Sequence, residues 1–140
     1  MHRVLTTVLV ALAPGLITCG GSPPRQPVAR SPDTVCVQVL RRLRQCTDLY
    51  VPALVDARIS YDWPPGFAAM AEKEGRENLV IRAFEEWRAA STDEGIDAAC
   101  TAPSSRAART AASEGPRCLT ATACQPFVDC ALEARFRAPT

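Results

Sequence analysis

The side chains with the widest chemistry in this 140-residue chain are its cysteines, because histidine is nearly absent. The single histidine is His2, and the lack of imidazole further along excludes Ser-His and Cys-His nucleophile pairs and His-containing zinc sites. Cysteines can also bind metals or run redox chemistry as C-x-x-C pairs, but the chain contains no such pair. We therefore predict no catalytic residue, no metal site and no cofactor, and we expect a protein that is not an enzyme.

Carboxylates and aromatic rings offer the remaining chemistry. Glu85 and Glu86 are adjacent, and neighbours on a helix point in different directions, which suits paired acid–base work poorly. Residues 61–66 (YDWPPG) form a Pro-framed aromatic loop, in which Tyr61 and Trp63 make a candidate binding surface. The alternative, and the more common role of such a Trp, is to plug the edge of a small core.

The N-terminal residues are typical of an export signal. A short basic start that ends at Arg3 precedes an almost wholly apolar stretch over residues 4–17. That stretch is shorter than the roughly 20 apolar residues that a spanning helix needs. We therefore predict a signal peptide over residues 1–18 and no transmembrane helix.

The end of the apolar stretch, Leu16-Ile17-Thr18-Cys19, resembles a bacterial lipobox, the signal for lipoprotein processing. The resemblance implies cleavage before Cys19 and diacylation of its thiol. Thr18 departs from the pattern, which usually has Gly, Ala or Ser at that position. The alternative is that Cys19 is an incidental residue of an ordinary cleaved leader. Gly20 is not the acidic residue that retains some lipoproteins at the inner membrane, so the resemblance implies the outer membrane.

A Pro-rich segment follows the lipobox. Residues 19–34 contain four prolines among small and polar residues, which favours an extended, semi-rigid tether. At about 3.1 Å per residue, such a tether holds a domain roughly 40–50 Å from a membrane. We predict that the folded domain occupies residues 35–140.

Six cysteines remain once Cys19 is set aside, and an even number in a small exported domain predicts three disulfides. They are Cys36, Cys46, Cys100, Cys118, Cys124 and Cys130. If the first and last helices run antiparallel, the nested bonds Cys36–Cys130 and Cys46–Cys124 come within reach and leave Cys100–Cys118. An alternative set contains Cys46–Cys118 and Cys100–Cys124.

The apolar residues of this domain recur at steps of three and four, which predicts an all-α fold. We expect a first helix from Ser31 or Asp33 that ends or kinks at Pro52, with a short helical piece after it. Two helices divided at Gly75 should follow, then one capped at residues 91–94 and a last one over residues 125–135. Residues 101–115 read as a loop or a weak Ala-rich helix. The domain is thus a small helical bundle stapled by disulfides.

The balance of acidic and basic side chains indicates which classes of partner the chain can bind. Without Arg3 the chain has 15 basic and 15 acidic side chains, which does not favour nucleic acid. With its lipobox, tether and six cysteines, the chain resembles small cysteine-rich lipoproteins of GC-rich Gram-negative bacteria, a resemblance that implies no particular activity. We expect a lipid-anchored interaction or structural module of the cell envelope, with the membrane and an unidentified protein as partners. The alternatives are a soluble periplasmic or secreted disulfide-rich protein and, less favoured, a carboxylate- or thiol-based enzyme.

Overall fold

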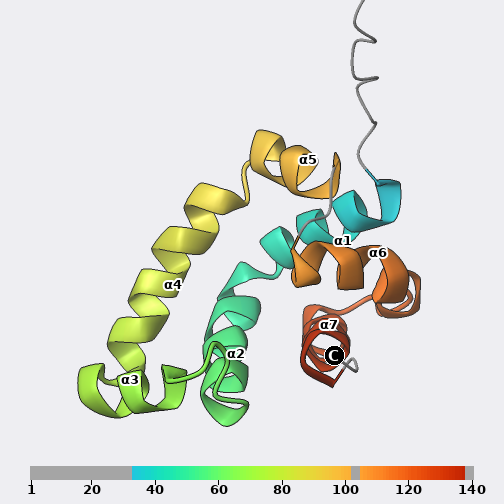
Figure 1. The fold of residues 1–140 in the computed structure, drawn as a ribbon. Coiled ribbons are helices and arrows are strands. Elements are labelled where there is room, and N and C mark those ends of the chain that lie inside the picture. The colour runs from blue at the N-terminus through green and yellow to red at the C-terminus, as the bar shows by residue number, and fades with distance from the viewer. Residues whose placement is uncertain (1–32, 102–104, 138–140) are drawn as a thin grey trace, which may run out of the picture.

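The computed structural model describes residues 33–101 and 105–137, and within them the chain is helical with no strand (Figure 1). The all-α prediction is therefore confirmed. The helices are α1 (Thr34–Gln45), α2 (Thr47–Ser60), α3 (Phe67–Glu74), α4 (Arg76–Ala90), α5 (Asp93–Thr101), α6 (Arg106–Cys118) and α7 (Cys124–Arg137).

The helices are arranged around α2 and α1. In Figure 1, α3 and α4 lie on one side of α2 and α7 lies on the other, in agreement with the packing contacts of α2. Helix α1 packs against α5 and α6, and α6 in turn packs against α7. The last helix is therefore held between α2 and α6.

Local signals in the sequence place most of the helix ends. The Asp33 carboxylate accepts a hydrogen bond from the Cys36 N–H at 2.8 Å and caps α1. The Thr92 hydroxyl accepts from the Gly95 N–H at 3.0 Å in the first turn of α5. Gly75 has φ +82°, a left-handed conformation that separates α3 from α4 as expected. Ser105 caps α6 by accepting from the Ala108 N–H, and residues 106–115, for which a loop or a weak helix was predicted, belong to this helix.

The predicted break at Pro52 is wrong, because the chain bends six residues earlier. Cys46 has φ −103° and ψ 23°, and the Thr47 hydroxyl donates to the Arg44 carbonyl at 2.6 Å across the bend. Pro52 then lies inside α2, where its missing N–H leaves the Asp48 carbonyl without a helical partner. Asp48 is exposed, so water can supply that hydrogen bond.

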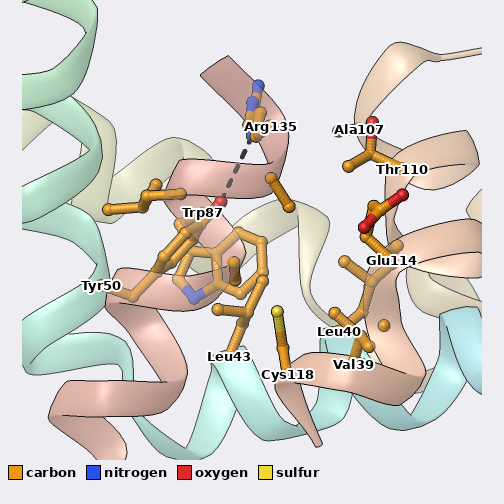
Figure 2. A pocket seen from close by; sticks show the side chains of 15 residues that line it. Val39, Leu40, Leu43, Tyr50, Trp87, Ala107, Thr110, Glu114, Cys118 and Arg135 are labelled. Carbon is orange, nitrogen blue, oxygen red and sulfur yellow. Dashed lines mark hydrogen bonds between the residues drawn. The ribbon is translucent and has the colours of Figure 1, made fainter. Parts of the chain in front are cut away.

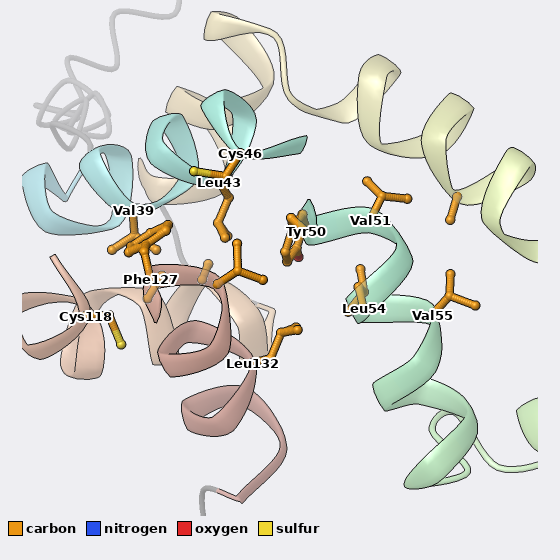
Figure 3. Close-up of a cluster of buried hydrophobic side chains, with 14 of the residues drawn as sticks. Val39, Leu43, Cys46, Tyr50, Val51, Leu54, Val55, Cys118, Phe127 and Leu132 are labelled. Atoms are coloured by element: carbon orange, nitrogen blue, oxygen red, sulfur yellow. The ribbon is translucent and has the colours of Figure 1, made fainter. Parts of the chain in front are cut away.

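Every helix except α3 contributes buried side chains to the core, and α3 packs against it through Phe67 and Ala71. Its largest fully buried apolar side chains are Phe127, Ile96, Val51, Val55 and Val128. Figure 3 shows Phe127 beside Val39 and Leu43 of α1, and Tyr50 between that group and the valines of α2. One continuous core therefore joins the two sides of the molecule.

Three disulfides join the helices, and all six cysteines of the described residues take part. The bonds are Cys36–Cys100, Cys46–Cys124 and Cys118–Cys130, with Cα–Cα distances of 5.7, 5.5 and 5.5 Å. Of the pairs that the sequence suggested, the structure contains only Cys46–Cys124.

The other suggested pairs, Cys36–Cys130, Cys100–Cys118, Cys46–Cys118 and Cys100–Cys124, are wrong because α7 packs along α2 and α6 rather than along α1. The neighbour of α1 at its start is the end of α5, where the Asp33 N–H donates to the Cys100 carbonyl at 3.0 Å. Cys36 therefore meets Cys100, and Cys130 is left to the end of α6.

Candidate binding site

The Pro-framed loop between α2 and α3 is fixed by its own backbone and by Asp62. The Asp62 carboxylate accepts hydrogen bonds from the backbone N–H groups of Gly66 at 3.1 Å and Ala68 at 2.9 Å. These hydrogen bonds lower the pKa of Asp62 below its usual value. The Trp63 N–H donates to the Arg58 carbonyl at 2.9 Å, and the Trp63–Pro64 peptide bond is cis. Tyr61 and Trp63 are thus presented on a defined turn.

Both rings of the predicted binding loop contact the last turn of α7 and still face solvent. Tyr61 stacks on Phe136 with ring centroids 5.2 Å apart, and Trp63 meets the same ring edge-on at 6.2 Å. Tyr61 is 52% exposed and Trp63 is 39% exposed. The loop therefore covers the edge of the core, as the common alternative has it, and also leaves aromatic surface accessible to a ligand.

Arg135 connects this aromatic group to the core. Its guanidinium carbon lies 5.5 Å from the Trp63 ring centroid and 5.7 Å from that of Phe136, within the range of cation–π contacts. One guanidinium nitrogen donates to the Tyr50 hydroxyl at 3.3 Å, as Figure 2 shows. Burial raises the pKa of Tyr50, while Arg135 and Arg58 act in the opposite direction.

These side chains surround a pocket of about 230 Å³ on the surface, which we call the aromatic–arginine pocket. It is formed by the 61–66 loop, the start of α6 and the end of α7. Its residues are Tyr61, Trp63, Ser105, Arg106, Ala107, Arg135 and Phe136.

A second arginine lies by another cavity that Trp63 borders. Arg58 lines a shallow space of about 430 Å³ with Trp63, Phe67 and Glu86, and its guanidinium carbon is 5.7 Å from the Phe67 ring centroid. The Arg58 Nε is buried and has no hydrogen-bond partner. Burial lowers the pKa of Arg58, and the positive charge of Arg135 lowers it further. Positive charge thus accumulates around Trp63.

A smaller cavity of about 100 Å³ lies between α1, α6 and α7 (Figure 2). Its walls are mostly aliphatic and aromatic, with Arg135 and Glu114 among the few charged residues that line it. This space is too small for an ordinary ligand and is better described as a gap in packing.

The other candidate residues for chemistry are exposed carboxylates and cysteines that are already bonded in disulfides. Glu85 and Glu86 are both exposed on α4, and every cysteine of the described residues is in a disulfide and offers no thiolate. In residues 33–101 and 105–137, no three metal-ligating side chains lie close enough to hold an ion. No helix in the same part of the chain has the length and apolarity to cross a membrane. Arg41 and Arg44 both pair with Asp93.

The sequence identified one side of the pocket and missed the other. Tyr61 and Trp63 were found through their loop, whereas Arg135 and Phe136 lay at the edge of the predicted last helix with no local signal of a site. Ser105 and Arg106 lay in the stretch predicted as a loop or a weak Ala-rich helix. Cys19, the predicted lipidation site, lies outside the described residues.

Comparisons of the chain with models of protein families, with curated proteins and with solved structures give no match, so its function is argued from the residues themselves.

Proposed function

We propose that this chain is a lipid-anchored protein of the bacterial envelope whose helical domain serves as a non-enzymatic binding module. The observation that supports the anchor most directly is the use of cysteines. The six cysteines after residue 35 pair with one another, and this leaves Cys19 as the one cysteine without a place in a disulfide of the domain. Cys19 is also the residue at which the apolar leader ends.

The way the domain begins suits attachment to a tether. Asp33 caps α1, its N–H donates to the Cys100 carbonyl, and the Cys36–Cys100 disulfide follows within the first turn. The point at which the Pro-rich segment joins the domain is therefore covalently fixed to α5. A domain held through its N-terminal end gains from such a junction, because a pull on the tether does not unwind α1 from its start.

The binding role is supported by the aromatic–arginine pocket, which combines exposed rings with arginine side chains in a hollow of the surface. Sites of this composition recognise ligands without needing an acid, a base or a nucleophile. The outer membrane is the destination that we propose, on the resemblance of the residues around Cys19 to a lipobox followed by Gly20.

The anchor is tested by detergent partitioning of the chain expressed in a Gram-negative host. The wild-type chain should enter the detergent phase, and Cys19→Ala should be lost from it and accumulate as precursor or as soluble product. Thr18→Ala is the matched control, because it changes the neighbouring residue and brings the lipobox closer to the usual pattern. It should partition like wild type or better.

The alternative of a soluble periplasmic or secreted protein is favoured by one feature, the departure of Thr18 from the lipobox pattern. It predicts that wild type and Cys19→Ala behave alike and stay in the aqueous phase. Intact mass separates the two further, since lipidation adds the mass of the acyl chains to Cys19 and simple cleavage adds nothing.

A further inference from the structure

We propose that the aromatic–arginine pocket binds a small aromatic carboxylate, with the ring of the ligand against Tyr61 and Trp63 and its carboxylate on Arg135. This inference deepens the binding role proposed above and rests on it, but it does not depend on the lipid anchor.

The aromatic half of the proposal follows from the walls of the pocket. Tyr61, Trp63 and Phe136 contribute three rings, and the first two keep much of their surface exposed. Aromatic rings attract another flat ring in stacked or edge-on geometry, and they gain most where the surface is already concave. The Tyr61–Phe136 stack and the hydrogen bonds of the 61–66 loop hold these rings in place before a ligand arrives. A pre-arranged site loses less entropy on binding.

The anionic half follows from charge that the fold leaves uncompensated. In the described part of the chain, neither Arg135 nor Arg58 forms an ion pair with a carboxylate. The nearby Glu133 is engaged by Arg137 at 2.6 Å, and Glu86 acts on Arg58 only through space. The guanidinium of Arg135 has Tyr50 as its hydrogen-bond partner, which leaves donors for a further group. A planar carboxylate fits the planar donor geometry of arginine.

The volume of the pocket limits the size of the ligand. A volume of about 230 Å³ is below the several hundred Å³ of pockets that enclose drug-sized molecules, and it suits a single ring with a short acidic arm. A ligand of this size should bind weakly, with a Kd of roughly a millimolar.

The test uses the ¹⁵N-labelled full chain in non-ionic detergent and follows the two indole N–H signals by NMR. Trp63 reports on the pocket, and Trp87, whose indole N–H donates to the Thr47 hydroxyl at 3.0 Å, serves as the internal control. Indole-3-acetate should shift the Trp63 signal saturably and leave Trp87 in place. Indole-3-acetamide, which lacks only the charge, and acetate, which lacks only the ring, should each bind about tenfold more weakly or worse.

Variants distinguish binding in the pocket from non-specific attraction of the ligand to positive charge. Arg135→Gln should weaken indole-3-acetate binding severalfold, and Arg117→Gln, the same change at the far end of α6, should have no effect. Cys19→Ala should bind as wild type does, so a failed anchor leaves this test intact. The proposal is overturned if Trp63 shows no saturable shift, if the amide or acetate matches indole-3-acetate, or if Arg117→Gln weakens binding as much as Arg135→Gln does.

Discussion

Gly115 shows how a single residue sets the distance between two helices. It lies near the end of α6 and faces α1, where a Cβ atom on its backbone would approach Val39 Cγ2 to 2.6 Å and Val35 Cγ1 to 2.8 Å. Real Cβ atoms do not come so near, and the β-branched valines have few other rotamers to adopt. In the sequence, Gly115 precedes Pro116 and ends the stretch predicted as a loop or a weak Ala-rich helix. Its reason for being glycine is visible only once α1 lies against it.

Gly115→Ala should therefore destabilise the domain by about 1–3 kcal/mol, the usual range for overpacking. Helix propensity alone predicts the opposite sign, because Ala is better than Gly in a helix by about 1 kcal/mol. The urea midpoint of unfolding measures the difference. Ser113→Ala, an exposed position of the same helix, should change stability by less than about 0.5 kcal/mol. An unchanged or raised midpoint for Gly115→Ala would contradict the close contact.

The stability of the domain should depend on pH through Asp62. Its folded-state pKa is lowered because its carboxylate accepts the N–H groups of Ala68 and Gly66. A carboxyl with a lowered folded pKa stabilises the fold at neutral pH, and this stabilisation is lost as the pH falls below about 4. Asn is the right replacement, because it tolerates the positive φ of 44° and still offers one oxygen.

Asp62→Asn should accordingly be less stable than wild type at pH 7, and the difference in stability should be smaller at pH 3. Urea unfolding at both pH values gives the comparison. Glu72→Gln, which removes an exposed carboxylate from α3, controls for the change in net charge and should show no such convergence. A difference in stability between wild type and Asp62→Asn that is the same at both pH values would rule out a stabilising role for the negative charge of Asp62.

At the scale of elements, the sequence predicted where the helices lie in the chain better than it predicted which helices pack against one another. Caps such as Asp33 and the glycine at residue 75 act within one turn, so they could be read locally. The bend at Cys46 could not, because it depends on the disulfide and on the packing of α2 against α4 and α7. The same limit explains the cysteines: pairing follows from which helices are adjacent, and the sequence does not contain that information.

The disulfides should also differ in how much each contributes to the free energy of unfolding. Cys46–Cys124 joins residues 78 apart, and Cys118–Cys130 joins residues only 12 apart. Each pair has one buried and one half-buried cysteine, so replacement by Ala leaves similar packing defects. In the entropic account the longer loop contributes more, although Cys36–Cys100 already shortens it. The double variant Cys46→Ala/Cys124→Ala should therefore lose about 1 kcal/mol more than Cys118→Ala/Cys130→Ala.

Chemical denaturation of the two double variants against wild type gives this ordering directly. Both variants lack one bond and two sulfur atoms, so each serves as the matched control for the other. Equal losses would mean that loop length does not decide the contribution of these bonds, and a larger loss for Cys118–Cys130 would point to strain or packing at the α6–α7 contact instead.

At the scale of the whole molecule, only part of the candidate site could be predicted from the sequence. Tyr61 and Trp63 could be selected because an aromatic loop framed by prolines is a local pattern. Arg135 and Phe136 lie near the other end of the chain, and only the packing of α7 along α2 brings them to that loop. A pocket built by tertiary contact leaves no spacing in the sequence to detect. The proposed ligand class therefore rests on the structure rather than on any motif.

The last prediction concerns the stability of the domain as one body. Its core is built from short helices with few large aromatic side chains, and a domain near 100 residues has a total stability of only about 5–15 kcal/mol. Each disulfide contributes roughly 2–4 kcal/mol, so the three together are comparable with that whole. Reduction should then lower the melting temperature by about 20 °C or more, or leave the chain unfolded at room temperature.

Circular dichroism at 222 nm with and without a phosphine reductant measures the change. Intact mass of the unreduced protein should be lower by about six hydrogens than that of the reduced chain, as the pairing of all six cysteines requires. Thiol labelling under native conditions should modify none of the six. Two or more labelled cysteines, or a melt indifferent to the reductant, would show that the helical packing suffices without its bonds, and a thiol-based activity would then have to be considered again.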